Sequence, residues 1–267
     1  MYIRRGRPSA AIFMLPLFLI AASGCDLAFK DFRASQTADW QKTYELTPGG
    51  HVEVANVSGR IQVQPSTGNR VEVFARKIGK AATQEAARQA LERVEIEESV
   101  SPSSIRIGTK LQRTSNWFGG GNVEVDYTVR VPAGADVKFS TVNGAVDITG
   151  LTGQVTAENV NGGIKLIDVA GGIKASTVNG GVVAELTRIS DSGVRLECTN
   201  GAIKLLLPRD TKANLSARVM NGGIHTSGLD IESSGESSSR RLEGRLNGGG
   251  PKIDLEGTNG GISIGAK

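Results

Sequence analysis

Few residues in this chain have the types and spacing that catalysis or metal binding requires. The 267 residues include two histidines and two cysteines, too few for a zinc or iron–sulfur site with several such ligands. No Ser/His/Asp set is evident around His51 or His225. A polysaccharide lyase would need clustered aspartates for calcium beside an Arg or Lys base, and the acidic residues in the second half of the chain are scattered. The sequence therefore predicts no metal site, no cofactor and no catalytic residue.

The neighbours of Cys25 indicate another kind of chemistry, the covalent attachment of lipid. Three arginines near the start precede an apolar stretch over residues 10–22, and small residues lead to Cys25. This layout is typical of a bacterial secretory signal, and residues 22–25 resemble a lipobox. The apolar stretch is shorter than the ~20 residues of a transmembrane helix. We expect cleavage of a signal peptide over 1–24 and acylation of Cys25, which would anchor the protein to a membrane; the alternative is a soluble secreted protein.

The charge of the chain argues against one large class of partner. Lysine and arginine number 31, and aspartate and glutamate number 27. Cleavage after residue 24 would remove three arginines and no acid, leaving 28 basic residues against 27 acidic ones. A nearly neutral protein has no basic field to attract nucleic acid, so none is expected as a partner. Cys198 would have no second cysteine for an intramolecular disulfide, and we expect it to be a small buried residue on a strand.

Two adjacent aromatic residues are candidates for contact with a partner. Aromatic residues make up only 4% of the chain, yet Trp117 and Phe118 stand together before three glycines. They lie in the loop between two expected strands, 105–111 and 123–131. Such a hairpin tip could contact a protein, a sugar or a membrane. The alternative is that the rings fold back and cover one end of the β-structure.

The strongest pattern in the sequence is an Asn-Gly pair followed by a small residue and alternating aliphatic residues. The first two intervals between these asparagines are 18 residues and the next two are 21. Asparagine and glycine supply the backbone conformations that sharp corners require. Stacked copies would form an asparagine ladder with a structural role. The asparagines of this pattern are Asn143, Asn161, Asn179, Asn200, Asn221 and Asn259.

Two further segments fit the same pattern less closely. Ser58 stands in place of asparagine in one copy, which suggests that the amino-terminal strands join the stack. Asn247 begins a variant copy near the end of the chain.

Regular short repeats predict a solenoid, because a single coil buries too little apolar surface to be stable alone. We expect an all-β fold, a right-handed parallel β-helix-like stack of coils of ~18–21 residues, with one short helix over about 83–94. The rival topology is an antiparallel meander of hairpins, because Asn-Gly also favours two-residue hairpin turns.

The chain divides into four expected segments along its length. After the signal peptide, residues 25–42 are expected to be a tether, because they are polar with scattered apolar residues. Residues 43–131 form an amino-terminal β-rich region with the short helix. Residues 132–267 form the Asn-Gly repeat solenoid, which we expect to be continuous with the β-rich region.

A family resemblance rests on the entry to the repeats. The segment Val131-Pro132-Ala133-Gly134-Ala135-Asp136-Val137, followed by recurring Asn-Gly-Gly-Ile, resembles the bacterial "putative adhesin" family of β-strand-repeat envelope lipoproteins. The resemblance covers about residues 45–265. It implies an all-β solenoid of the right-handed β-helix type, and it assigns no catalytic positions.

These observations together predict a lipid-anchored, non-catalytic protein of the bacterial cell envelope, adhesin-like or structural. Its expected partners are a membrane, through the lipid anchor, and an envelope protein or a surface polysaccharide. Asp26 resembles a signal for retention in the inner membrane, but the choice between membranes stays open. The alternatives are a signalling partner in envelope stress and a carbohydrate-active enzyme on a β-helix.

Overall fold

A computed structural model describes residues 34–112, 121–233 and 237–267 of the chain. The described residues form strands and one helix, in agreement with the expected all-β class. The elements are β1 (Ala34–Glu45), β2 (His51–Ala55), β3 (Ile61–Ser66), β4 (Arg70–Ala81), α1 (Gln84–Glu92), β5 (Val94–Ser101), β6 (Ser104–Leu111), β7 (Asn122–Pro132), β8 (Asp136–Asn143), β9 (Val146–Thr149), β10 (Val155–Asn161), β11 (Ile164–Asn179), β12 (Val182–Asn200), β13 (Ile203–Leu207), β14 (Ala213–Asn221), β15 (Ile224–Ser227), β16 (Ile231–Ser233), β17 (Arg241–Leu246), β18 (Lys252–Asn259) and β19 (Ile262–Ala266).

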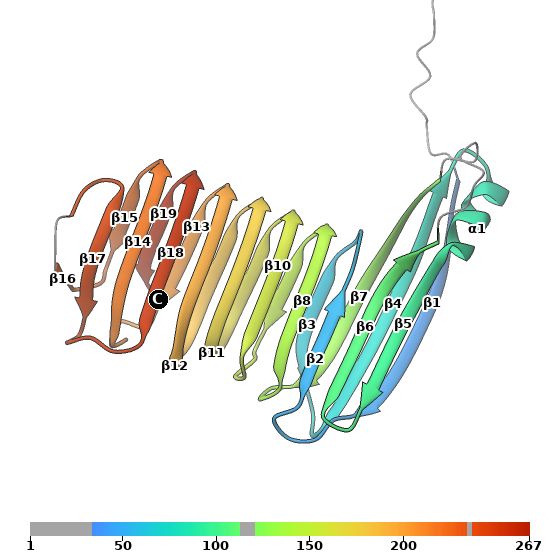
Figure 1. Ribbon diagram of the computed structural model, residues 1–267, viewed down its shortest axis with the longest axis horizontal. Coiled ribbons are helices and arrows are strands. Elements are labelled where there is room, and N and C mark those ends of the chain that lie inside the picture. Colours follow the sequence, from blue (N-terminus) through green and yellow to red (C-terminus); the bar gives the residue numbers. More distant parts are fainter. Residues whose placement is uncertain (1–33, 113–120, 234–236) are drawn as a thin grey trace, which may run out of the picture. The chain divides into compact units, whose positions relative to one another are not determined.

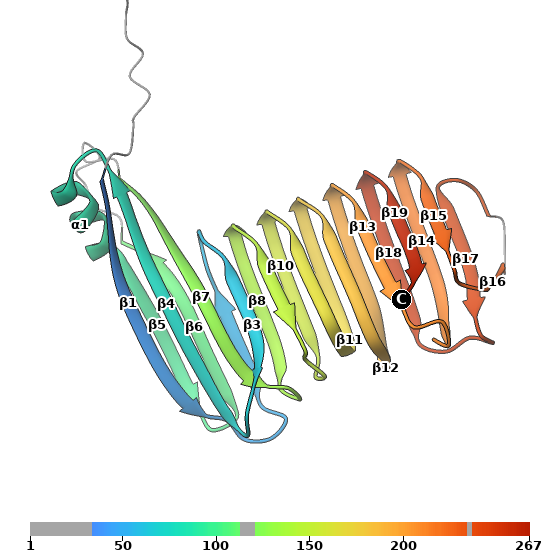
Figure 2. The same ribbon diagram turned by 180° about the vertical axis from the view of Figure 1, so that it is seen from behind.

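The strands form two faces that lie over one another and meet at corners (Figures 1 and 2). The first face contains β6, β2, β8, β10, β18 and β14, and the second contains β7, β3, β9, β13, β19 and β15. The long strands β11 and β12 bend and contribute one half to each face. Within these sets neighbouring strands are parallel, which confirms the solenoid and excludes the hairpin meander for the repeats.

Each coil runs along the first face, turns at an Asn-Gly corner and returns along the second face. We name each coil after its corner residue, so that β8 and β9 form the Asn143 coil. The corner residues of successive coils are in register: Asn161 is the Cα partner of both Asn143 and Asn179. The register places identical residue types at the same point of each coil.

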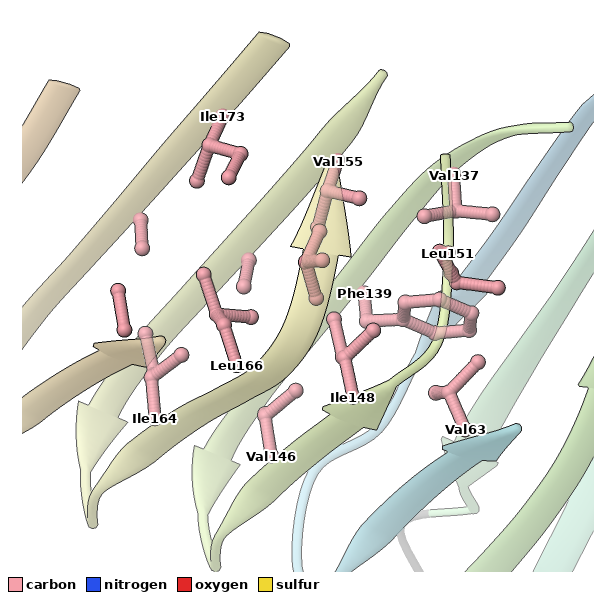
Figure 3. Close-up of a cluster of buried hydrophobic side chains, with 14 of the residues drawn as sticks. Val63, Val137, Phe139, Val146, Ile148, Leu151, Val155, Ile164, Leu166 and Ile173 are labelled. Atoms are coloured by element: carbon pink, nitrogen blue, oxygen red, sulfur yellow. The ribbon is translucent and has the colours of Figure 1, made fainter. Parts of the chain in front are cut away.

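Alternation along the strands explains the thin aliphatic core between the faces. On β8, Val137 and Phe139 point inward and are buried, while Lys138 and Ser140 point outward. Figure 3 shows these inward side chains meeting aliphatic residues of neighbouring coils. Burial of such side chains supplies the main favourable free energy of folding. The labelled core residues in Figure 3 are Val63, Val137, Phe139, Val146, Ile148, Leu151, Val155, Ile164, Leu166 and Ile173.

The amino-terminal end differs from the coils because its outer strands are antiparallel. Strand β1 pairs with β4, β4 with β7, and β5 with β6. The helix α1 covers this end and begins as expected at Thr83, whose Oγ1 accepts a hydrogen bond from the Ala86 N–H at 3.2 Å. Ala87, Ala90 and Leu91 form its buried face. The sequence-based prediction of one short helix is confirmed.

The expected tether over 25–42 is wrong at its carboxyl end, because residues 34–42 belong to β1. Only part of the inward face of β1 is apolar: Trp40 and Tyr44 are partly buried against the core. The strand is an edge strand that pairs with β4 alone among the described residues. A half-polar edge strand therefore looks like a polar linker in the sequence.

The amino-terminal strands are continuous with the repeats, as the Ser58 copy suggests. Strand β2 pairs with β8, β3 pairs with β9, and Ser58 forms a bridge with Asn143. The Ser58 coil is therefore the first coil with this corner, and β6 and β7 pair with it on its other side.

The order of the last two coils differs from the order of the sequence. Strand β18 lies between β12 and β14, and β19 lies between β13 and β15. The Asn259 coil, the last in the chain, is thus inserted between the Asn200 and Asn221 coils. Strands β17 and β16 continue the first face beyond β14 with antiparallel pairing.

Candidate functional site

The six corner asparagines form one continuous ladder along an exposed edge of the stack. Each link joins the Nδ2 of one asparagine to the Oδ1 of the asparagine in the next coil, at 2.8–2.9 Å. The structure thus brings together all six residues that the sequence singles out. In space the ladder runs Asn143, Asn161, Asn179, Asn200, Asn259 and Asn221.

The glycine after each asparagine is required by the close approach of the coils. Gly162 has a φ of 144°, and a Cβ at this position would overlap the carbonyl oxygen of Gly144 in the coil below. The next residue is less constrained: a Cβ on Gly163 would have its nearest neighbour at 3.5 Å. Alanine occupies the equivalent place at Ala145 and Ala202.

Asn247 does not belong to the ladder, so its reading as a variant copy is wrong. Its φ is 50°, and its Nδ2 donates to the carbonyl oxygens of Arg209 and Thr211 at 3.0 and 2.9 Å. The Asn-Gly-Gly sequence serves here to turn the chain between β17 and β18.

A second column, missed by sequence reasoning, lies just inside the ladder. Two positions before the corner asparagine, a buried polar side chain donates to a glycine carbonyl oxygen of the preceding coil. The donors are Asn159 Nδ2 to Gly144 at 2.7 Å, Thr177 Oγ1 to Gly162 at 2.9 Å, and Cys198 Sγ to Gly180 at 3.0 Å. The signal in the sequence is a polar residue at one recurring position that alternation assigns to the core.

Cys198 therefore has a structural place in this column. It is buried as expected, and this burial raises the pKa of its thiol above the ordinary value. A protonated, buried thiol is a poor nucleophile.

The outward side chains of the first face form a mixed-charge surface. Arg195 contacts Asp254 and Glu256 at 3.4 Å, and Lys138 contacts Glu158 at 3.4 Å. Apart from Asp254, which is mostly buried, these side chains are about half-exposed, so the pairs other than Arg195–Asp254 contribute little to stability. A shallow hollow of about 330 Å³ lies beside Arg195.

No catalytic arrangement is present among the described residues. His225 is next to Ser263 on the second face, and Ser263 is next to Lys204, but no hydrogen bond joins His225 to Ser263 in the described part. Within the same residues, no group of three or more His, Cys, Asp or Glu side chains could hold a metal ion.

Exposed apolar residues accompany the asparagine ladder. Each precedes a corner asparagine; in the Asn200 and Asn259 coils, which lie between Val178 and Met220, threonine takes this place. Their exposed fractions are Val142 41%, Val160 40%, Val178 42% and Met220 64%. The edge therefore presents amide and methyl groups side by side.

The lipidation candidate Cys25 and the aromatic pair Trp117 and Phe118 lie outside the described residues. The residues that flank the aromatic loop are described and lie beside α1. The Gln112 N–H donates to the Arg93 carbonyl oxygen at 2.9 Å, and a Cβ on Gly121 would be 3.0 Å from the Ala90 Cβ. No helix among the described residues has the length and hydropathy to cross a membrane.

Comparison with solved structures gives distant similarities. A protein of Clostridium sporogenes, described as a putative cell adhesion protein, has 11% identity and a TM-score of 0.47, covering 86% of this chain and 100% of its own. A putative adhesin of Bacteroides fragilis has 12% identity and a TM-score of 0.29, with coverages of 86% and 97%. A putative lipid binding protein of Parabacteroides distasonis has 7% identity and a TM-score of 0.24, with coverages of 88% and 98%.

No curated protein sequence matches the chain significantly. A family model, however, matches residues 45–265, the same part of the chain that carries the family resemblance in the sequence. The chain belongs to the Toastrack DUF4097 family.

Proposed function

We propose that this protein is a lipid-anchored, non-catalytic component of the bacterial cell envelope that presents a stiff β-solenoid to a partner. The observation that carries the proposal is the asparagine ladder, whose links run without interruption from Asn143 to Asn221. The ladder and the aliphatic core favour a role as a rigid support over a role as a catalytic domain. Its outer faces offer flat, repetitive surfaces, which suit a large partner better than a small substrate.

The sequence around Cys25 supports the anchor, and the short distance along the chain from Cys25 to β1 supports a membrane near the β1 end. Eight residues lie between Cys25 and Ala34, so the distance between them is at most about 32 Å when the segment is fully extended. Ala34 lies in a small buried cluster with Ala81 and Ala87 of the α1 end. In this proposal the α1 end stays close to the membrane, and the coils from Asn143 onward are more remote.

The same geometry gives Trp117 and Phe118 a proposed role. The described residues on either side of this pair, Gln112 and Gly121, lie beside α1, at the end nearest the proposed anchor. We propose that these two rings contact the membrane surface or a partner close to it. The remote edge, with its amides and exposed valines, is the surface proposed for an envelope protein or a surface polysaccharide.

Labelling with a palmitate analogue in the native host tests the anchor. The proposal predicts label on the wild-type protein, none on a Cys25→Ala variant, and recovery of the wild type in the membrane fraction. Labelling of both proteins, or recovery of unlabelled wild type in the soluble fraction, would contradict it.

Crosslinking in intact cells tests the presentation of the remote edge. The Val160→Cys variant, with a photoreactive thiol reagent on the exposed edge, should capture a partner. The control is Arg76→Cys on β4, an exposed position near the α1 end, and it should not capture the same partner. Equal capture at both positions would contradict the proposed edge.

A further inference from the structure

We propose that the hollow beside Arg195 binds an acidic sugar unit, a sugar that carries a carboxylate among its hydroxyl groups. The hollow lies on the first face, near the corner opposite the asparagine ladder. Its volume of about 330 Å³ is close to the lower limit of ligand pockets, so it suits a small unit of a polymer rather than a folded protein. The inference rests on the proposed function, in which an envelope component is the partner, and it gives a surface polysaccharide a site of its own, apart from the remote edge.

Cationic side chains surround the hollow. Among the described residues that line it, the cations are Lys174, Arg195 and Lys252, and the one carboxylate is that of Asp254. Asp254 lies 3.4 Å from Arg195 and 3.0 Å from Lys252, so it orients both of these side chains. Three positive charges against one negative charge leave the lining positive, and a ligand with a carboxylate complements it.

Lys174 is the cation of the lining that has no carboxylate partner. It is exposed and forms no ion pair within the described part of the chain, whereas Arg195 also contacts Glu197 and Glu256 on the side of the asparagine ladder. Lys174 and Arg195 are Cα partners on β11 and β12, and like charges on neighbouring strands repel one another. A carboxylate bound between them would offset this repulsion.

Neutral hydrogen-bonding groups complete the lining and point to a hydroxylated ligand. Gln154 lies over Gly172, where a Cβ would overlap its Oε1, and its Nε2 donates to Ser192 Oγ at 2.7 Å. Thr156 is the Cα partner of Lys174 and also lines the hollow. Amide and hydroxyl groups supply both donors and acceptors, as the hydroxyl groups of a sugar require, whereas a simple anion needs donors alone.

Calorimetric titration of the purified full-length protein with trigalacturonate, at low ionic strength, tests the site. Trigalacturonate should bind, and both the neutral trisaccharide galactotriose and sodium acetate should bind at least about tenfold more weakly. The comparison is sharp because galactotriose has hydroxyl groups without a carboxylate, and acetate has a carboxylate without hydroxyl groups.

A matched pair of lysine variants assigns the binding to the hollow. Lys174→Gln should weaken the binding of trigalacturonate about tenfold, because it removes a charge-assisted hydrogen bond. Lys165→Gln makes the same change on the same strand, but Lys165 lies on the second face, so this variant should bind as the wild type does. Neither lysine forms an ion pair within the described residues, and both variants should unfold at the wild-type temperature.

The proposal is wrong if trigalacturonate does not bind, or if the two lysine variants lose affinity equally. It is also wrong if acetate binds as tightly as trigalacturonate, because the hollow would then be a simple counter-ion site. The titration in solution involves neither the lipid anchor nor capture at Val160. Its failure therefore leaves the proposed function standing, and failure of the labelling or crosslinking experiments leaves this site standing.

Discussion

The two corners of each coil differ in how strictly they repeat. The Asn-Gly corner keeps the same length and the same asparagine in every coil from Asn143 onward. The opposite corner varies. Along the pair of β11 and β12, the register offset is 18 residues on the second face, where Ile164 faces Val182, and 21 on the first face, where Asn179 faces Asn200. The extra residues lie in the opposite corner, around 190–193.

The difference shows where the register of the stack is determined. At the Asn-Gly corner, amide links, glycine contacts and the interior polar column all depend on exact alignment of successive coils. At the opposite corner, connections run over the surface, where added residues cost little conformational free energy. One corner therefore fixes the register, and the other absorbs changes in length.

The largest predicted effect is the difference in stability between alanine substitutions at two adjacent glycines of one corner. Gly162→Ala should lower the free energy of unfolding by at least ~3 kcal/mol or prevent folding, because its Cβ would overlap the Gly144 carbonyl. Gly163→Ala should change it by less than ~1 kcal/mol, since alanine already occupies this place in two coils. Urea denaturation followed by circular dichroism measures both. Equal losses would mean that the contact between coils does not determine the corner.

The interior column provides a second matched pair, Thr141 and Thr177, which are buried to the same extent and are both changed to the isosteric valine. Thr177→Val should cost ~1–3 kcal/mol, because the buried Gly162 carbonyl loses a donor. Thr141 has the equivalent place in the Asn143 coil, but its Oγ1 has no hydrogen-bond partner within the described residues. The corresponding carbonyl oxygen, that of Gly59, already accepts a hydrogen bond from Asn56 Nδ2 at 3.3 Å. Thr141→Val should therefore be neutral or stabilising in the same denaturation assay. The reverse ranking would show that the column is not a set of hydrogen-bond donors.

The ladder itself predicts an effect that depends on position. Asn179→Ala removes two amide links and should cost ~1–2 kcal/mol. Asn221→Ala, at the end of the ladder, removes one link and should cost about half as much. Thermal and urea unfolding would both report the difference. Identical effects at the two positions would argue that the amide links do not act as a continuous ladder.

The smallest predicted effect is at the opposite corner. Deletion of residues 190–192 would restore the 18-residue spacing, and it should change the unfolding free energy by less than ~1 kcal/mol. The deletion removes the hydrogen bond between Gln154 Nε2 and Ser192 Oγ, which is exposed, and the Ser190 hydroxyl, which is buried and has no partner among the described residues. The control inserts one glycine after Gly162. The comparison between corners fails if the insertion is tolerated as well as the deletion.

Much of the fold follows from short-range pattern in the sequence. The Asn-Gly spacing predicts the coils, alternation predicts which side chains are buried, and Thr83 with the following alanines predicts α1. The asparagine ladder follows from the recurring Asn-Gly pair, because each copy turns the chain at the same place in its coil.

Other features depend on information that the pattern does not contain. The Asn221 and Asn259 coils share one template, so either could stack on the Asn200 coil, and the sequence does not rank them. Strand β1 has too few apolar residues to stand out from a linker. The interior donors at Asn159 and Thr177 become visible only when the carbonyl groups of the preceding coil are in place.

The Asn259 coil lies inside the ladder, between the Asn200 and Asn221 coils. Ser263 has two Cα partners, Lys204 and His225, and neighbouring strands are ~4.8 Å apart, within disulfide range, whereas a second neighbour at ~9.6 Å is not. Oxidation of two double variants, Lys204→Cys with Ser263→Cys and Lys204→Cys with His225→Cys, tests the order directly. The structure predicts a disulfide in the first variant and none in the second. A disulfide in the second and none in the first would show that the coils stack in the order of the sequence.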